Sequence, residues 1–288
     1  MAAIKSYKGF DKNLKCRDFQ YEIGKEYEMD GEIKVCSRGF HSCESPFDVF
    51  DHYTMIDSRF CEVEQDGNIS KEDRGTKICS SKIKIKAELK LADMINLGVE
   101  WLKEITSPKK MKTSIKDNSS GYGAKIGSSG NDAQIGSSGY GAKIGSSGND
   151  ALIGSSGNDA KIGSSGYGAK IGSSGNDAQI GSSGNGAKIG SSGNGAKIGS
   201  SGNGAKIGSS GNDAQIDSTG EDCVIMCAGI NSVAKASKGS WITLSEWSYS
   251  DKKQRYIPVC VKTEFVDGEK IKADTYYKLD GGVFKEIQ

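Results

Sequence analysis

The sequence predicts a mainly β protein built around a parallel β-solenoid, with an N-terminal α+β domain and a small β-rich C-terminal cap. Three observations lead to this fold class. A nine-residue unit, G-(Y/N)-(G/D)-A-(K/Q/L)-I-G-S-S, occurs eleven times between Gly121 and Thr219 of the 288-residue chain. Its fourth position is always Ala and its sixth is always Ile. The flanking segments have ordinary composition and contain all eight cysteines.

The repeated unit resembles a flexible linker in composition, because linkers are often rich in Gly and Ser. A linker has no need of an invariant Ile in every ninth position, however. Ala, a polar residue and Ile in succession form a short strand with both apolar side chains on one face. The Gly, Ser and Asn residues between these strands favour turns, where Gly and Asn accept a positive φ. A sustained short period of this kind is typical of a β-solenoid.

The length of one coil follows from chain geometry. Nine extended residues span at most roughly 30 Å, whereas two facing walls about 10 Å apart need a loop of roughly 40 Å. We therefore predict about 18 residues per coil, formed by two units. Twelve units, counting residues 220–228, make about six coils, with one or two wider coils after them. The side chains expected in the thin core include Ala124, Ile126, Ala133, Ile135, Ala160, Ile162, Ala187 and Ile189.

The outward positions of the array predict a solvated surface. The array has seven Lys and six Asp, and no aromatic residue lies between the lysines to stack on a base, so we expect no nucleic acid partner. The unit also resembles the calcium-binding nonapeptide G-G-x-G-x-D-x-U-x. Only five of the eleven units have Asp in the matching position, and Ile comes one place too late. We therefore predict no metal in the array.

Residues 1–110 read as the separate α+β domain. We expect strands in SYKGF, in IKVCSRGFHSC, at 59–64 and at 82–89, and a helix beginning at Ser45 and Pro46, which suit an N-cap and a first helical position. The apolar spacing in 91–105 predicts an amphipathic helix. The solenoid is assigned to 111–237 and the cap to 238–288, with hairpins around Asp267-Gly268 and Gly281-Gly282. Trp241 and Trp247 are expected in the core of the cap.

Three segments of the N-terminal domain follow one another in an order similar to that of ADP-ribosyltransferases: YKGF at 7–10, RGFHSC at 38–43 and EVE at 62–64. The resemblance implies phosphate binding, nucleotide orientation and catalysis, in that order, by Lys8 or Arg38, by Ser42, and by Glu62 or Glu64. The chain departs from that family in a short spacing before EVE and in Cys43, where Ser or Thr is usual. We therefore expect no enzyme and keep a transferase head as the alternative.

The cysteines and histidines of the N-terminal domain include residues that could form a metal or nucleophile site. Cys36, His41 and Cys43, with Cys16 as a fourth residue, are candidates for zinc, but C-x4-H-x-C is an unusual spacing and no CxxC completes the set. A Cys–His pair would have to use His41 or His52, the two histidines of the chain. We predict no metal, no cofactor and no catalytic residue.

The whole chain resembles a group of uncharacterised phage and prophage proteins. The resemblance lies in YKGFDKNLKCRDFQYEIGKEYE, in VCSRGFHSCESPFDVF and in GSWITLSEW at 239–247. Those proteins carry the same N-terminal module ahead of nonapeptide arrays. The resemblance implies a phage-derived binding or scaffold protein that engages a host protein, such as a defence component. A structural accessory part of a virion is the other alternative.

Charge and targeting signals agree with an intracellular binding protein. The net charge is +1, and MAAIKSYKGF lacks the apolar stretch of a secretory signal. No run of 18 apolar residues predicts a membrane span, so we expect reduced thiols and a location in the host cytosol, or else in the virion. Self-association through the solenoid or the caps stays open. The side chains expected to be exposed and to contact a protein partner are Lys8, Arg17, Tyr21, Arg38, His41, Tyr53 and Arg59.

Overall fold

The computed structural model describes residues 3–72, 75–105 and 121–287. The chain forms two compact units, Met1–Trp101 and Leu102–Gln288. The second unit contains a parallel β-solenoid of paired nonapeptides, so the predicted fold class is confirmed. The predicted domain boundary between 110 and 111 lies outside the described residues.

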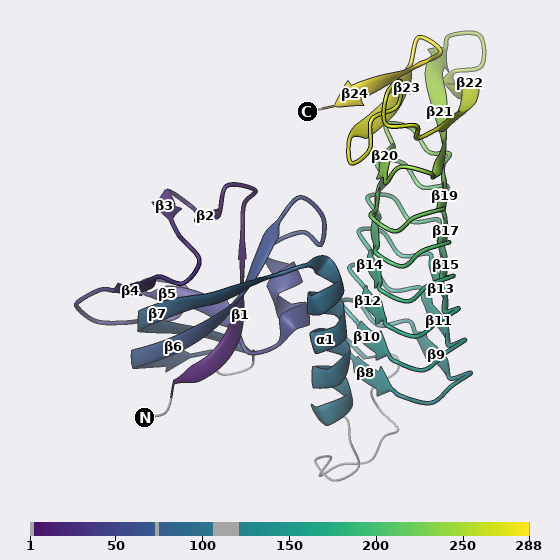
Figure 1. Ribbon diagram of the computed structural model, residues 1–288. Coiled ribbons are helices and arrows are strands. Elements are labelled where there is room, and N and C mark those ends of the chain that lie inside the picture. Colours follow the sequence, from purple (N-terminus) through teal and green to yellow (C-terminus); the bar gives the residue numbers. More distant parts are fainter. Residues whose placement is uncertain (1–2, 73–74, 106–120, 288) are drawn as a thin grey trace. The chain divides into compact units, whose positions relative to one another are not determined.

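The N-terminal unit is a five-stranded antiparallel sheet in the order β4-β7-β5-β1-β6 (Figure 1). Because β6 also pairs with β7, the strands β1, β6, β7 and β5 close into a ring. A small hairpin, β2 and β3, adjoins the sheet in sequence. The strands are β1 (Ile4–Phe10), β2 (Lys15–Cys16), β3 (Phe19–Gln20), β4 (Glu26–Glu28), β5 (Phe40–Cys43), β6 (Arg59–Lys71) and β7 (Lys77–Leu89).

Local sequence signals account for the helical segments after Ser45 and at 91–105. The amphipathic segment predicted at 91–105 is α1 (Leu91–Ile105). The segment after Ser45 is a 3-10 helix, η1 (Pro46–Asp51), in which Ser45 Oγ accepts a hydrogen bond from the backbone N–H of Asp48 at 3.4 Å. The predicted strands at 59–64 and 82–89 both extend to 13 residues, because each pairs with the other along most of its length.

The solenoid has two walls of parallel strands, and each residue pairs with the residue 18 positions further along (Figure 1). One wall contains β8 (Lys125–Ser128), β10 (Lys143–Ser146), β12 (Lys161–Ser164), β14 (Gln179–Ser182), β16 (Lys197–Ser200), β18 (Gln215–Ser218) and β20 (Val233–Ala236). The other contains β9 (Gln134–Ser137), β11 (Leu152–Ser155), β13 (Lys170–Ser173), β15 (Lys188–Ser191), β17 (Lys206–Ser209), β19 (Val224–Cys227) and the start of β21 (Trp241–Ser250). The strands β20 and β21 thus complete a coil beyond the six made by the nonapeptides.

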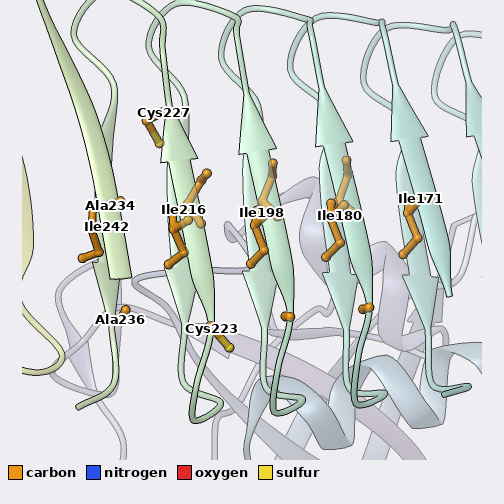
Figure 2. Packing of buried hydrophobic residues seen from close by; sticks show 14 of the residues in the cluster. Ile171, Ile180, Ile198, Ile216, Cys223, Cys227, Ala234, Ala236 and Ile242 are labelled. Atoms are coloured by element: carbon orange, nitrogen blue, oxygen red, sulfur yellow. The ribbon is translucent and has the colours of Figure 1, made fainter. Parts of the chain in front are cut away.

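Ile side chains form a ladder in the core. Figure 2 shows Ile180, Ile198 and Ile216 in the same place on successive coils. The predicted core residues Ala160, Ile162, Ala187 and Ile189 are buried, as is Ala124. Ile126, Ala133 and Ile135 are half-buried in the first coil. Each strand spans positions five to eight of the unit rather than four to six, so the Ser at position eight also points inward.

The turns differ in one respect from the prediction. The residue with positive φ is at position three, filled by Gly or Asp, and not the Asn at position two. Asp132, Asp150, Asp159, Asp177 and Asp213 all have φ of 55° or 56°, beside Gly residues at the same position with φ of 64° to 69°. Asp tolerates the left-handed region. This explains why the third position of the repeat accepts both Gly and Asp.

The C-terminal residues continue the solenoid and then form two hairpins. The start of β21 stacks in parallel on β19 with a spacing of 17 residues, one fewer than in the preceding coils, before β21 pairs with β22 (Arg255–Phe265). The second hairpin joins β23 (Tyr276–Asp280) to β24 (Val283–Ile287) across Gly281-Gly282, as predicted. The hairpin predicted at Asp267-Gly268 is wrong. Asp267 instead accepts hydrogen bonds from the backbone N–H groups of Glu269 and Ile271 within a loop.

The two tryptophans predicted in the core of the cap differ in exposure. Trp241 is 47% exposed, so its assignment to the core is wrong, whereas Trp247 is half-buried and its Nε1 donates to the carbonyl of Ala228 at 2.9 Å. Within the described part of the chain, no helix has the length and hydropathy that crossing a membrane requires.

Candidate ligand pocket

A cavity of about 570 Å³ lies in the N-terminal unit, lined by β1, the β2–β3 hairpin, β5 and the residues that follow η1. Its wall combines basic and aromatic side chains. They include Tyr7, Lys8, Arg17, Phe19, Tyr21, Phe40, His41, His52, Tyr53 and Lys77.

Lys8 is the buried basic residue of this pocket. Strand alternation places Ser6, Lys8 and Phe10 on the same side of β1, and the side chain of Lys8 is only 4% exposed. Its Nζ donates to the carbonyl oxygen of His41 at 2.8 Å and lies 3.6 Å from Cys16 Sγ. Within the described residues, no carboxylate forms an ion pair with it. Burial lowers the pKa of Lys8, although the neighbouring Cys16 raises it.

Aromatic rings and a thiol complete the surroundings of Lys8. Its Nζ lies 5.4 Å from the ring centroids of both Phe10 and Tyr21. The hydroxyl of Tyr53 donates to Cys16 Sγ at 3.1 Å. Cation–π contacts of this kind partly offset the loss of hydration of a buried ammonium group, but they carry no negative charge.

A buried polar network behind the pocket holds β5 in place. Ser42 Oγ lies 2.8 Å from Ser6 Oγ, and Gln65 Nε2 donates to Ser42 Oγ at 2.6 Å and to the carbonyl of Phe40 at 3.0 Å. Ser80 Oγ donates to the other end of the Gln65 amide. Since each of these side chains has a partner, the network is a satisfied structural element. The network thus holds β5 in position, and the His41 carbonyl oxygen of that strand accepts the hydrogen bond from Lys8 Nζ.

The electrostatic environment of the pocket is positive. His41 Nε2 accepts a hydrogen bond from the backbone N–H of Cys36 at 3.0 Å. Burial lowers the pKa of His41, and Lys8, Lys77 and Arg17 lower it further. Burial and Lys77 likewise lower the pKa of His52, although nearby acidic residues oppose this in part. Asp18 is the one carboxylate among the side chains that line the cavity.

Five of the seven predicted contact residues meet in this pocket: Lys8, Arg17, Tyr21, His41 and Tyr53. Two of them are buried rather than exposed as expected, because Lys8 and Tyr21 face the interior of the unit.

Arg38 and Arg59, the other two predicted contact residues, are outside the lining. Arg38 Nη2 donates to the carbonyl of Asp30 at 2.6 Å. The guanidinium group of Arg59 makes two hydrogen bonds to Glu88, at 2.6 and 2.7 Å. Both guanidinium groups are thus engaged with groups of their own unit.

The structure does not assemble the residues that the resemblance to ADP-ribosyltransferases implies. Glu62 and Glu64 alternate along β6 with the buried Cys61 and Val63, and so project to the opposite face of the strand. They pair with Lys5 at 2.7 Å and Lys86 at 2.9 Å. Neither lines the cavity that contains Lys8 and Ser42.

The sequence offered metal and nucleophile sites at His41 and Cys16, and the contacts of these two side chains are different ones. Across residues 3–72, 75–105 and 121–287, no group of three or more His, Cys, Asp or Glu side chains converges as metal ligands would. The Nε2 lone pair of His41 is occupied by the Cys36 N–H, and Cys16 contacts Lys8 and Tyr53 rather than a histidine.

Three lining residues were not among the predicted partner contacts: Cys16 and His52, which the sequence offered only as metal or nucleophile candidates, and Lys77. For Lys8, which was expected to be exposed, the alternation along β1 was an available signal of burial, because it places Lys8 on the same face as the buried Phe10. Lys77 begins β7 and His52 follows η1, and only the folded sheet brings them to the pocket.

Residues 4–97 match a family model described as a domain of unknown function, DUF7666. These residues cover nearly all of the N-terminal unit, including every residue that lines the pocket. No curated protein and no solved structure matches the chain.

Proposed function

We propose that the chain is a binding protein that engages a host protein through its N-terminal unit, as a phage-derived factor in the bacterial cytosol. A defence component of the host is the partner that this role implies. The supporting observation is that five of the side chains predicted to contact a partner, including Arg17 and His41, line one pocket. Arg and aromatic side chains beside a concavity are frequent anchors of protein interfaces.

The solenoid serves this function as a rigid presenting element. Its exposed strand positions repeat every 18 residues, for example at Lys170, Lys188 and Lys206. A surface that repeats in every coil discriminates poorly between partners. We therefore assign recognition to the N-terminal unit, and spacing or a second, avidity-type contact to the solenoid.

Affinity capture with the full-length protein from lysate of an infected or lysogenic host, followed by mass spectrometry, tests this function. We compare the wild type with Arg17→Glu in the pocket and with Lys206→Glu on the solenoid, since both side chains are exposed. The wild type and Lys206→Glu should retain the same host protein, and Arg17→Glu should lose it. Loss with Lys206→Glu alone would make the solenoid face the functional surface.

A further inference from the structure

We propose that the pocket of the N-terminal unit binds a small organic anion, one that carries a phosphate or carboxylate group on a flat ring. The carrying observation is the juxtaposition of the buried ammonium of Lys8 with Arg17, Lys77 and the aromatic side chains of one cavity. This inference goes beyond the proposed function, because it needs no protein partner.

The charge of the ligand follows from Lys8. A buried cation is normally paired with an anion, since burial removes its hydration. Here its polar contacts are a carbonyl oxygen and a thiol, and its nearest rings are neutral. Arg17 and Lys77 add positive charge to the same cavity, against the single carboxylate of Asp18. An anion inside the cavity would supply the missing counter-charge.

The position of His41 also supports a negatively charged ligand. Its ring lines the cavity with three cationic neighbours, Lys8, Lys77 and Arg17, each of which opposes its protonation. The approach of an anion would relieve that repulsion. Arg17 stands at the exposed turn between β2 and β3, with φ of 55°, where it can reach a ligand that enters from solvent.

The shape of the ligand follows from the cavity walls. A volume of about 570 Å³ is within the usual range for sites of small molecules. Tyr21, Phe40 and Tyr53 provide flat apolar surfaces, and Phe19, 46% exposed, also lines the cavity. Aromatic rings favour offset or edge contacts with another ring. A ligand that combines a ring with an anionic group would contact both the aromatic and the basic side chains of the cavity.

Isothermal titration calorimetry on the full-length protein, at low salt and pH 7, tests this proposal with simple probes. Phenyl phosphate and benzoate carry both a ring and a negative charge. Inorganic phosphate and acetate lack the ring, and benzyl alcohol lacks the charge. We expect the better of the two ring-bearing anions to bind at least about tenfold more tightly than either its ring-free counterpart or benzyl alcohol. Which of the two binds better identifies phosphate or carboxylate as the anionic group.

Three variants connect the binding to the pocket. Lys8→Met keeps the length of the side chain without its charge. It should lower the affinity for the ring-bearing anion to that for benzyl alcohol. Arg17→Asn keeps an exposed turn residue that tolerates a positive φ and should weaken binding several-fold without affecting folding. Lys206→Met, on the solenoid, should bind like the wild type. If Lys8→Met does not fold, the comparison of Arg17→Asn with Lys206→Met still shows whether the anion binds in this pocket.

The proposal fails if neither ring-bearing anion binds, if benzyl alcohol binds as tightly as they do, or if folded Lys8→Met or Arg17→Asn binds like the wild type. Its failure is separable from that of the proposed function. Anion binding by the purified protein without capture of a host protein would overturn only the proposed function. The reverse result would overturn only the anion site.

Discussion

The side-chain Oδ1 of Asn176 accepts a hydrogen bond from the backbone N–H of Asn194, 18 residues further along, at 2.9 Å. The same contact joins Asn158 to Asn176 and Asn194 to Asn212, so these residues form a ladder at the turns. Neighbouring coils are therefore joined by side chains as well as by the strands. The Asn at position two of the repeat holds one coil to the next, a role that its position in a turn did not reveal.

Removal of one Asn side chain from this ladder should have a modest effect on stability. Asn176→Ala deletes the acceptor for the Asn194 N–H, which is near solvent and can bond to water instead. We expect the free energy of unfolding to fall by about 0.5–1.5 kcal/mol, measured by urea denaturation. Lys188→Ala, at an exposed strand position, is the control and should change stability by less than about 0.5 kcal/mol. Equal losses in the two variants would show that the Asn ladder adds nothing.

Two glycines of one repeat should respond in opposite ways to alanine. A Cβ on Gly166 would lie far inside contact distance of the backbone carbonyl oxygen of Gly148, whereas a Cβ on Gly172 would meet nothing within 4 Å. Gly166→Ala should therefore separate two coils and cost at least about 2 kcal/mol. Gly172→Ala should be neutral or stabilise by roughly 0.5–1 kcal/mol, because Ala suits a strand better than Gly. Thermal unfolding of both variants provides the comparison, and similar melting temperatures would contradict the packing of the coils.

The inward Ser of the repeat should be replaceable. Ser182 is fully buried, and its hydroxyl has no hydrogen-bond partner among the described residues. Later coils carry Cys227 and Ala236 at the corresponding position. Because an unpaired buried hydroxyl is unfavourable, Ser182→Ala should leave stability unchanged or raise it by about 1 kcal/mol.

The matched control for this substitution is Ile180→Ala on the same strand. It removes a fully buried member of the Ile ladder and should cost about 2–4 kcal/mol. Chemical denaturation of the two variants measures both effects. A loss of more than about 1 kcal/mol for Ser182→Ala would reveal a hydrogen bond of the hydroxyl that stabilises the core.

Acid should destabilise the N-terminal unit through His41. The pKa of its imidazole is lowered from 6.5 by burial and by the nearby Lys8, Lys77 and Arg17. The unfolded chain therefore binds a proton more readily than the folded chain does. Stability should be unaffected well above pH 6.5 and should fall as the pH decreases through 6.5 towards the lowered pKa. Protonation of Nε2 would also remove the acceptor for the Cys36 N–H.

Urea denaturation of the wild type and of His41→Gln between pH 5 and pH 8 measures this dependence. The variant should lose part of the slope below pH 6.5. Some slope should remain, because burial and Lys77 also lower the pKa of His52. Identical slopes in the two proteins would contradict the lowered pKa of His41.

The sequence by itself determined the solenoid and the helix of residues 91–105. An invariant Ala and Ile in each unit specify which side of a strand is buried, and this pattern is local and repeats, so it needs no knowledge of distant residues. The coil length also followed from chain geometry alone. The hairpin at Asp267-Gly268 was wrong because turn-forming residues make a hairpin only where the strands on both sides can pair. Here β22 pairs with β21, which precedes it.

Only the tertiary structure decided where the pocket lies and which side chains line it. Lys8, His41 and Lys77 come from three strands far apart in the sequence, and the closed ring of β1, β6, β7 and β5 brings them together. The same closure turns Lys8 inward and leaves Glu62 and Glu64 on the other face of β6. The charge and type of each side chain can be read from the sequence. Burial and unpaired charge depend on what other strands place beside it, and they appear only when the sheet closes.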